Sequence, residues 1–184
     1  MTMKVLYGAN PEDIKTYDTA RLRREFLISD LFAADTVNFT YTHVDRLIKR
    51  AEAKALELGD VKRSNKRRLV MYIHPEVMPS CLLLMGITDL AEGSAWNTMP
   101  PHVHERRMEA YCYFDMAPED RIVHVMGEPD ETRHLIVADG DAVLSPAWSI
   151  HMGAGTGPYA FVWGMTGENQ EYNDVTPVAL AELK

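Results

Sequence analysis

The feature that most constrains the fold is a pair of histidines, His102 and His104, followed closely by Glu109. Side chains alternate along a β-strand, so the two imidazoles would share one face, about 6–7 Å apart. Both could then reach one metal ion at a bond length of roughly 2 Å. Glu109 has the opposite parity, so we expect a turn or bulge between His104 and Glu109 that brings its carboxylate to the same face. The distant His151 would complete a set of three histidines and one glutamate.

A simpler interpretation is that His102 and His104 are exposed strand histidines, because a lone His-x-His pair is common. Here a carboxylate stands nearby, and a second element, Gly140-x5-Pro146-x4-His151, also ends in histidine. We therefore favour a metal site. Zinc suits a set of imidazole and carboxylate ligands, with one ion per subunit, and Mn, Fe or Ni are alternatives.

Composition limits the partners of the chain. At 184 residues with 46% hydrophobic residues, it can form one domain with a sizeable core, with or without an arm. A net charge of -8 disfavours nucleic acid and anionic membranes. Cys81 and Cys112 lie in apolar runs and are expected to be buried free thiols. Residues 1–7 lack the apolar run of a signal peptide, and no apolar run could span a bilayer, so we expect a cytoplasmic protein.

From residue 69 the sequence reads as short strands separated by turn signals at even spacing. This pattern predicts a closed, antiparallel, all-β barrel. The expected strands cover residues 69–73, 82–90, 109–114, 121–126, 132–137, 142–145 and 159–165.

The first third of the chain is more mixed. Tyr17–Phe26 is a candidate for a short helix. Thr36–Val44 alternates β-branched and aromatic residues and predicts a strand, with no hairpin partner beside it. Arg46–Gly59 is rich in helix formers and ends in glycine, which predicts a second helix. Lys62–Arg68 is strongly basic, and we interpret it as a loop with solvated charges or a contact with acidic neighbours, with a nucleic-acid patch as the alternative.

Several strings together resemble one family. The histidine and glycine elements are similar to the two motifs of the cupin superfamily, and the longer strings resemble the 5-keto-4-deoxyuronate isomerase family, also called 4-deoxy-L-threo-5-hexosulose-uronate ketol-isomerases. The strings are residues 18–48, 96–100, 102–109, 131–134, 145–151 and 161–170.

The resemblance implies a jelly-roll-like cupin barrel around a metal ion. The family has two cupin barrels, whereas this chain resembles the start of the family to about Ile48 and its second half from about Glu52. We therefore expect residues 1–58 to form an N-terminal arm, a remnant of the first cupin half, with a connecting helix. Residues 59–184 would form the metal-binding barrel. The arm would add a strand to this barrel or to that of a neighbour, and the family resemblance implies a homo-oligomer, a hexamer.

The resemblance also implies an activity. The family converts 5-dehydro-4-deoxy-D-glucuronate to 3-deoxy-D-glycero-2,5-hexodiulosonate in the breakdown of pectin-derived uronates. Tyr111 shares the strand face of Glu109 and is a candidate acid or base. An arginine fork suits a substrate carboxylate, which makes Arg107 and Arg133 candidates for substrate binding, and Trp148 could form a wall of the pocket.

Two other functions fit the same residues. Three histidines and a glutamate also occur in cupin dioxygenases that use non-haem iron. A shortened chain could instead be a non-catalytic remnant that binds a metal or a sugar acid. Bound iron with oxygen consumption would indicate the first, and uronate binding without turnover would indicate the second.

Overall fold

The computed structural model describes residues 2–6, 14–18, 36–41, 44–50, 53–78, 80, 82–168 and 171–184, with side chains described from residue 50 onward. Strands dominate these ranges, as the sequence pattern predicts. No helix within them is long and apolar enough to cross a membrane.

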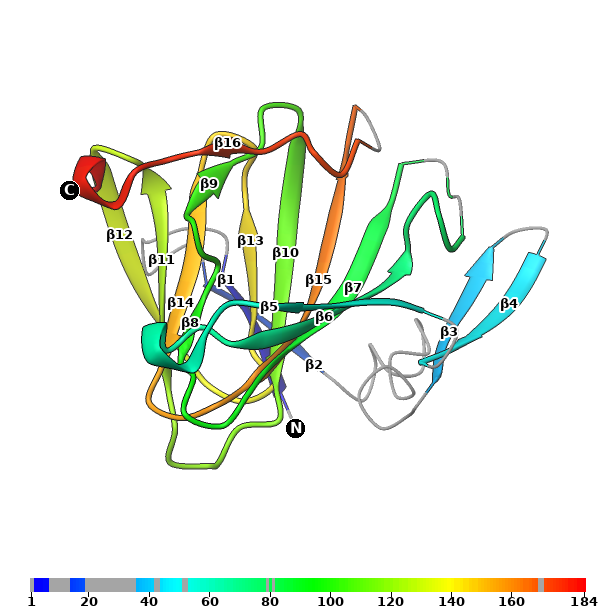
Figure 1. Ribbon diagram of the computed structural model, residues 1–184, viewed down its shortest axis with the longest axis horizontal. Helices are drawn as coiled ribbons and strands as arrows, with labels where there is room; N and C mark the ends of the chain where they lie inside the picture. Colours follow the sequence, from blue (N-terminus) through cyan, green and yellow to red (C-terminus); the bar gives the residue numbers. More distant parts are fainter. Residues whose placement is uncertain are drawn as a thin grey trace.

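Two sheets form the body of the molecule, and their neighbouring strands are antiparallel except for β1 and β13 (Figure 1). This arrangement confirms the expected antiparallel, cupin-like barrel. The eight-stranded sheet runs in the order β2 (Ile14–Asp18), β1 (Thr2–Leu6), β13 (Ala142–Ser145), β10 (Arg107–Phe114), β15 (Ala160–Gly167), β7 (Leu84–Leu90), β6 (Arg67–Ile73) and β5 (Lys54–Leu58). The four-stranded sheet runs β12 (Glu131–Val137), β11 (Ile122–Glu128), β14 (Ile150–Gly155) and β8 (Trp96–Asn97). Two short sheets pair β16 (Thr176–Pro177) with β9 (His102–Val103), and β3 (Thr36–Tyr41) with β4 (Val44–Lys49).

The main core contains side chains from both sheets, and β10 shows how it is built. Burial alternates along this strand, so Arg107, Glu109, Tyr111 and Tyr113 are buried while the residues between them are partly exposed. Tyr111 and Tyr113 join an apolar cluster with Phe161. Along one face, β10 therefore passes from apolar core to buried charged groups, and this end of the barrel holds the candidate site.

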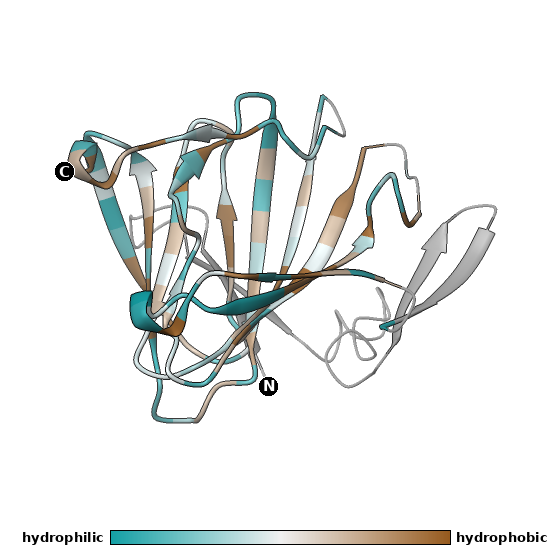
Figure 2. Cartoon of the chain, in the orientation of Figure 1, coloured by the Kyte–Doolittle hydropathy of each residue, from teal (hydrophilic) through white to brown (hydrophobic). Residues whose placement is uncertain are grey.

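Strand β6 is buried on both faces. Leu69 and Met71 belong to the main core, whereas Val70 and Tyr72 belong to a second cluster on the other face of the sheet. Figure 2 shows the contrast with the hydrophilic turn at Val61–Arg63, which precedes this strand. A strand that is buried on both sides cannot alternate between hydrophobic and polar residues, which explains the continuous apolar run Leu69–Ile73.

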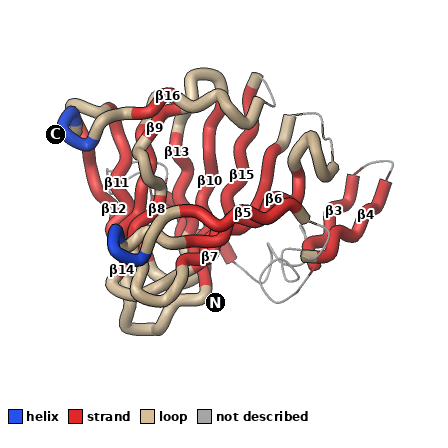
Figure 3. Tube along the Cα trace, viewed as in Figure 1, coloured by secondary structure: helices blue, strands red, loops and turns tan. Residues whose placement is uncertain are grey.

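The helix predicted over Arg46–Gly59 is wrong. Residues 44–49 form β4, and Lys54–Leu58 forms β5, which pairs along its whole length with β6. Figure 3 shows only short helical turns in the described part of the chain, at Val61–Arg63 and Leu180–Glu182. Pairing with an existing sheet edge outweighs helix propensity, which differs by only a few tenths of a kcal/mol among most residues.

Other expectations for the first third have mixed outcomes. The strand at Thr36–Val44 is confirmed over Thr36–Tyr41, but it has a hairpin partner, β4, contrary to expectation. Within residues 1–48, the described strands that join the barrel sheet are instead β1, which pairs with β13, and β2, which pairs with β1. Asp18 ends β2, and residues 19–26 of the first predicted helix lie outside the described residues. The division into an arm and a barrel at residue 58 stays a proposal.

Cys112 is a free thiol, as expected, and burial raises its pKa to about 12. Cys81 lies outside the described residues.

Replacing Gly86 by alanine should destabilise the protein. Gly86 on β7 pairs with Trp163 on β15, and an added Cβ would lie 2.3 Å from the Trp163 ring and 2.4 Å from the Val70 carbonyl oxygen. Because backbone must move, we expect Gly86→Ala to lower the free energy of unfolding by about 1–3 kcal/mol in urea titrations. The matched control is Gly164→Ala, where a Cβ meets no described atom within 4 Å. Equal stability of the two variants would contradict this packing.

Candidate metal centre

The four predicted ligand residues come together between the two sheets. His102 lies on β9, His104 follows that strand, Glu109 lies on β10 and His151 lies on β14. One ligand atom from each lies within 4.8 Å of the other three. Strand β9 ends at Val103 and β10 begins at Arg107, so the chain bends between His104 and Glu109 as the parity argument required.

The Glu109 carboxylate is at the centre of this group. Its Oε2 atom lies 2.7 Å from His151 Nε2 and 3.1 Å from His104 Nε2. His151 Nε2 also lies 3.2 Å from His102 Nε2. Glu109, His104 and His151 are each at most 5% exposed. The group is therefore almost closed to water, except at His102.

Two of the histidines are oriented by backbone carbonyls. His104 Nδ1 lies 2.6 Å from the carbonyl oxygen of Asp174, and His102 Nδ1 lies 3.1 Å from that of Pro100. A carbonyl oxygen only accepts hydrogen bonds, so each Nδ1 carries a proton and donates it. In a neutral imidazole this leaves a lone pair on Nε2, the atom that faces the cluster.

This arrangement calls for a positive charge between the groups. With Nδ1 bound to Asp174, a neutral His104 presents a lone pair to the Glu109 carboxylate at 3.1 Å, and both atoms are then acceptors. A cation between them would turn this repulsion into attraction. The residues present therefore fit a metal ion, and a proton on His104 is the alternative source of the charge.

The protonation states suit the same interpretation. Burial raises the pKa of Glu109, but His151 and His104 outweigh that effect and hold the pKa well below its usual range, so the carboxylate is ionised. Burial, together with the neighbouring His151, lowers the pKa of His102 to about 4. His102 is thus neutral near pH 7, and its lone pair is available to a cation.

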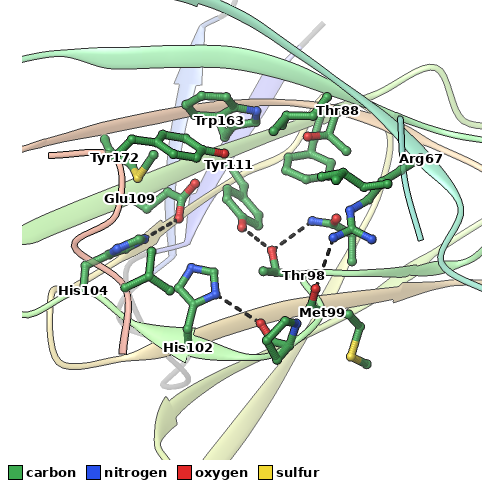
Figure 4. Close-up of a pocket in the computed structure, with 17 residues that line it drawn as sticks. Arg67, Thr88, Thr98, Met99, His102, His104, Glu109, Tyr111, Trp163 and Tyr172 are labelled. Atoms are coloured by element: carbon green, nitrogen blue, oxygen red, sulfur yellow. Dashed lines mark hydrogen bonds and ion pairs between the residues drawn. The ribbon is translucent and has the colours of Figure 1, made fainter. Parts of the chain in front are cut away.

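A cavity of about 230 Å³ opens beside this group (Figure 4). That is somewhat below the roughly 300–1,000 Å³ of pockets for drug-sized ligands, so it suits a small molecule. His102, His104 and Glu109 line one side, and Arg67 lies across from His102 and His104. Its apolar walls are Leu58, Leu69, Phe161, Trp163, Met165 and Val175.

Tyr111, the candidate acid or base, lines the cavity between these two sides (Figure 4). Its hydroxyl lies 2.6 Å from Thr98 Oγ1, which also accepts a 2.9 Å hydrogen bond from Asn97 Nδ2. Burial and the Glu109 charge raise the pKa of Tyr111 well above its usual range, so the side chain is a neutral phenol. Tyr111 therefore presents a neutral phenol at the cavity wall, and its role as acid or base stays a prediction.

None of the three candidates for substrate binding lines the cavity. Arg107 is 1% exposed and pairs with Asp174, with Nη2 donating to the Asp174 carbonyl at 3.0 Å. It therefore supports the residue that orients His104. Arg133 is exposed on β12 and pairs with Glu131 at 2.5 Å. Trp148 is 56% exposed.

The sequence interpretation missed Arg67, which was assigned to a solvated basic loop. Arg67 begins β6, and its side chain has the same parity as Leu69 and Met71, which face the main core. That two-residue spacing was the available signal for an inward-facing arginine.

Comparison with known proteins supports a family assignment. The KduI/IolB family model matches residues 31–180. A Cereibacter sphaeroides protein named 4-deoxy-L-threo-5-hexosulose-uronate ketol-isomerase is 54% identical over 142 residues, which cover 77% of this chain and 52% of that protein. An Edwardsiella ictaluri protein of the same name is 48% identical over 168 residues, covering 88% of this chain and 60% of that protein. The chain thus spans only about half to three-fifths of the length of these relatives.

Solved structures show the same fold. An IolB-like protein from Salmonella typhimurium matches with a TM-score of 0.65 at 17% identity, over 76% of this chain and 55% of that one. A predicted oxalate decarboxylase from Thermotoga maritima matches with a TM-score of 0.51 at 15% identity, over 66% of this chain and 98% of that one. With a family model that matches most of its length, this chain belongs to the KduI/IolB family and has a cupin-like fold.

Proposed function

We propose that this protein is a metal-dependent ketol-isomerase that converts 5-dehydro-4-deoxy-D-glucuronate to 3-deoxy-D-glycero-2,5-hexodiulosonate in the breakdown of pectin-derived uronates. The observation that carries the proposal is the convergence of His102, His104, Glu109 and His151 within 4.8 Å beside a small cavity. The relatives' shared name supports the reaction type.

These four side chains would hold the metal. Zinc is the ion that we propose, one per subunit, with Mn, Fe and Ni as alternatives for the same ligands. When bound, a divalent ion supplies a Lewis acid that stabilises negative charge on substrate oxygen. The ionised Glu109 and the neutral His102 are already in the protonation states that metal binding requires.

The reaction moves one proton from C2 to C1 and one from the C2 hydroxyl to the C1 oxygen, and it needs no external oxidant or reductant. A base removes the proton from C2, which carries the hydroxyl group, and a proton is returned to the aldehyde carbon C1. The double bond moves through an enediol, so C1 ends as an alcohol and C2 as a ketone. The Tyr111 hydroxyl, held by Thr98, is the proposed group that holds or moves a proton at a substrate oxygen.

The surroundings of Tyr111 favour this role. Leu69, Phe161, Trp163 and Met165 line the cavity around the polar groups and limit the water that can enter. Excluding water strengthens the remaining polar interactions and protects a reactive intermediate. Assembly into homo-oligomers, a hexamer among them, and a cytoplasmic location stay predictions from the sequence.

Loss of one ligand should remove the metal. We expect His104→Ala and His151→Ala to lower the metal content per chain at least tenfold, measured by mass spectrometry of the purified proteins, because each would remove one of four donors. The matched control is His134→Ala, which alters an exposed histidine on β12 and should leave the metal content unchanged. The same metal content per chain in all three variants would contradict the ligand assignment.

Activity should follow the metal. We expect the purified chain to interconvert the two sugar acids without oxygen, to lose this activity after treatment with a chelator, and to recover it when zinc is added back. Oxygen consumption with bound iron would instead indicate a dioxygenase. Saturable binding of the uronate without turnover would indicate a non-catalytic module.

Removing the Tyr111 hydroxyl should slow the chemical step. We expect Tyr111→Phe to lower kcat about 100-fold, the scale of acid–base contributions, with KM changed much less. Tyr113→Phe is the matched control, because Tyr113 lies on the same strand face but binds His124 and does not line the cavity. A kcat for Tyr111→Phe that matches this control would rule out the role.

A further inference from the structure

The buried arginine Arg67 has no role in the site described so far. It is 9% exposed and lines the cavity across from His102 and His104 (Figure 4). Its Nη1 donates to the carbonyl oxygen of Asn65 at 2.9 Å, and its Nη2 donates to that of Met99 at 3.1 Å. These two bonds fix the guanidinium at the cavity wall.

The charge of Arg67 is not balanced by a neighbour. Both of its hydrogen-bond partners are neutral carbonyls, and among the described side chains no carboxylate lies within the 4.0 Å of an ion pair. Arg107, by contrast, is buried with Asp174 as its counter-ion. Arginine stays protonated in proteins, so a guanidinium buried without an anion carries a desolvation cost. An anion bound in the cavity would offset that cost.

Guanidinium groups recognise carboxylates particularly well. Arginine carries five N–H donors in a planar fork, of which two are engaged here by Asn65 and Met99. The other donors can bind the two oxygens of a carboxylate, a charge-assisted arrangement that is stronger than neutral hydrogen bonds.

We propose that Arg67 binds the substrate carboxylate and thereby selects sugar acids over neutral sugars; this inference rests on the proposed isomerase function. In the six-carbon substrate the reacting carbons C1 and C2 lie at one end of the chain and the carboxylate lies at the other. The cavity is divided in the same way, with the candidate metal ligands on one side and Arg67 on the other.

The middle of the cavity fits this orientation. Between its two ends the substrate carries a C4 methylene group, which needs no hydrogen-bond partner. Phe161 and Leu69 supply apolar surface to the cavity, while Thr98 and Tyr111 supply hydroxyl groups that can bind substrate oxygens. Binding in the reverse direction, with the carboxylate at the histidines, would leave the Arg67 charge unpaired.

The test is a comparison of arginine variants on β6. We expect Arg67→Met to weaken binding of the equilibrium mixture of the two sugar acids at least tenfold in titration calorimetry and to raise KM by a similar factor. Arg67→Lys keeps the positive charge but loses the planar fork of donors, so it should weaken substrate binding less than Arg67→Met does. Arg68→Met is the matched control, because Arg68 is exposed on the same strand and does not line the cavity. Its Nε atom lies 3.8 Å from Oε1 of Glu57.

Metal content and thermal unfolding separate this role from a purely structural one. If Arg67 only held the loops at Asn65 and Met99, its variants would lose metal or thermal stability together with binding. We expect the metal content and the unfolding temperature of the Arg67 variants to stay at the level of the Arg68→Met control. Should Arg67→Met unfold, the Arg67→Lys variant decides the question.

The outcomes distinguish this inference from the proposed function. If the native chain turns over the substrate and the Arg67 variants keep the same KM and the same affinity, the role of Arg67 alone is overturned. Absence of turnover, combined with binding that depends on Arg67, would overturn the isomerase and keep the carboxylate site. Absence of both turnover and binding in the native chain would overturn both.

Discussion

The buried carboxylate of Glu109 is the constraint on which the candidate site depends. It cannot be placed among three imidazoles unless positive charge accompanies it, because the Nδ1 atoms of His102 and His104 are already engaged by carbonyl oxygens. Its position is fixed by the sheet, since Glu109 pairs with Ser145 on one side and Met165 on the other. The backbone around the charge is therefore rigid, and the imidazoles are brought to it by other segments.

The parts of the site that depend on local periodicity could be predicted from the sequence. The two-residue spacing of His102 and His104, and the opposite parity of Glu109, were enough to require the bend that separates β9 from β10. His151 was found through a second motif, although nothing local indicates that β14 lies opposite β9 and β10. Long-range pairing of this kind is set by the whole fold, and for these residues the family resemblance supplied it.

Two differences between the sequence-based expectations and the structure depend on partners elsewhere in the sequence, those at residues 54–58 and at Arg107. Residues 54–58 contain good helix formers but complete a sheet edge beside β6. Arg67, Arg107 and Arg133 look alike as basic residues near strands, yet one lines the cavity, one is buried against Asp174 and one is exposed beside Glu131. Only parity with Leu69 and Met71 could have identified Arg67 as the inward-facing arginine.

The distribution of the cavity residues bears on how a chain whose match covers only about half to three-fifths of its relatives' length could hold the site. Among the residues whose side chains are described, those that line the cavity fall between Leu58 and Val175, so they come from the barrel strands and the segments that join them. The C-terminal segment contributes directly, because the carbonyl of Asp174 orients His104 and Tyr172 lines the wall. Both the candidate ligands and the unpaired arginine thus belong to one continuous stretch of sequence.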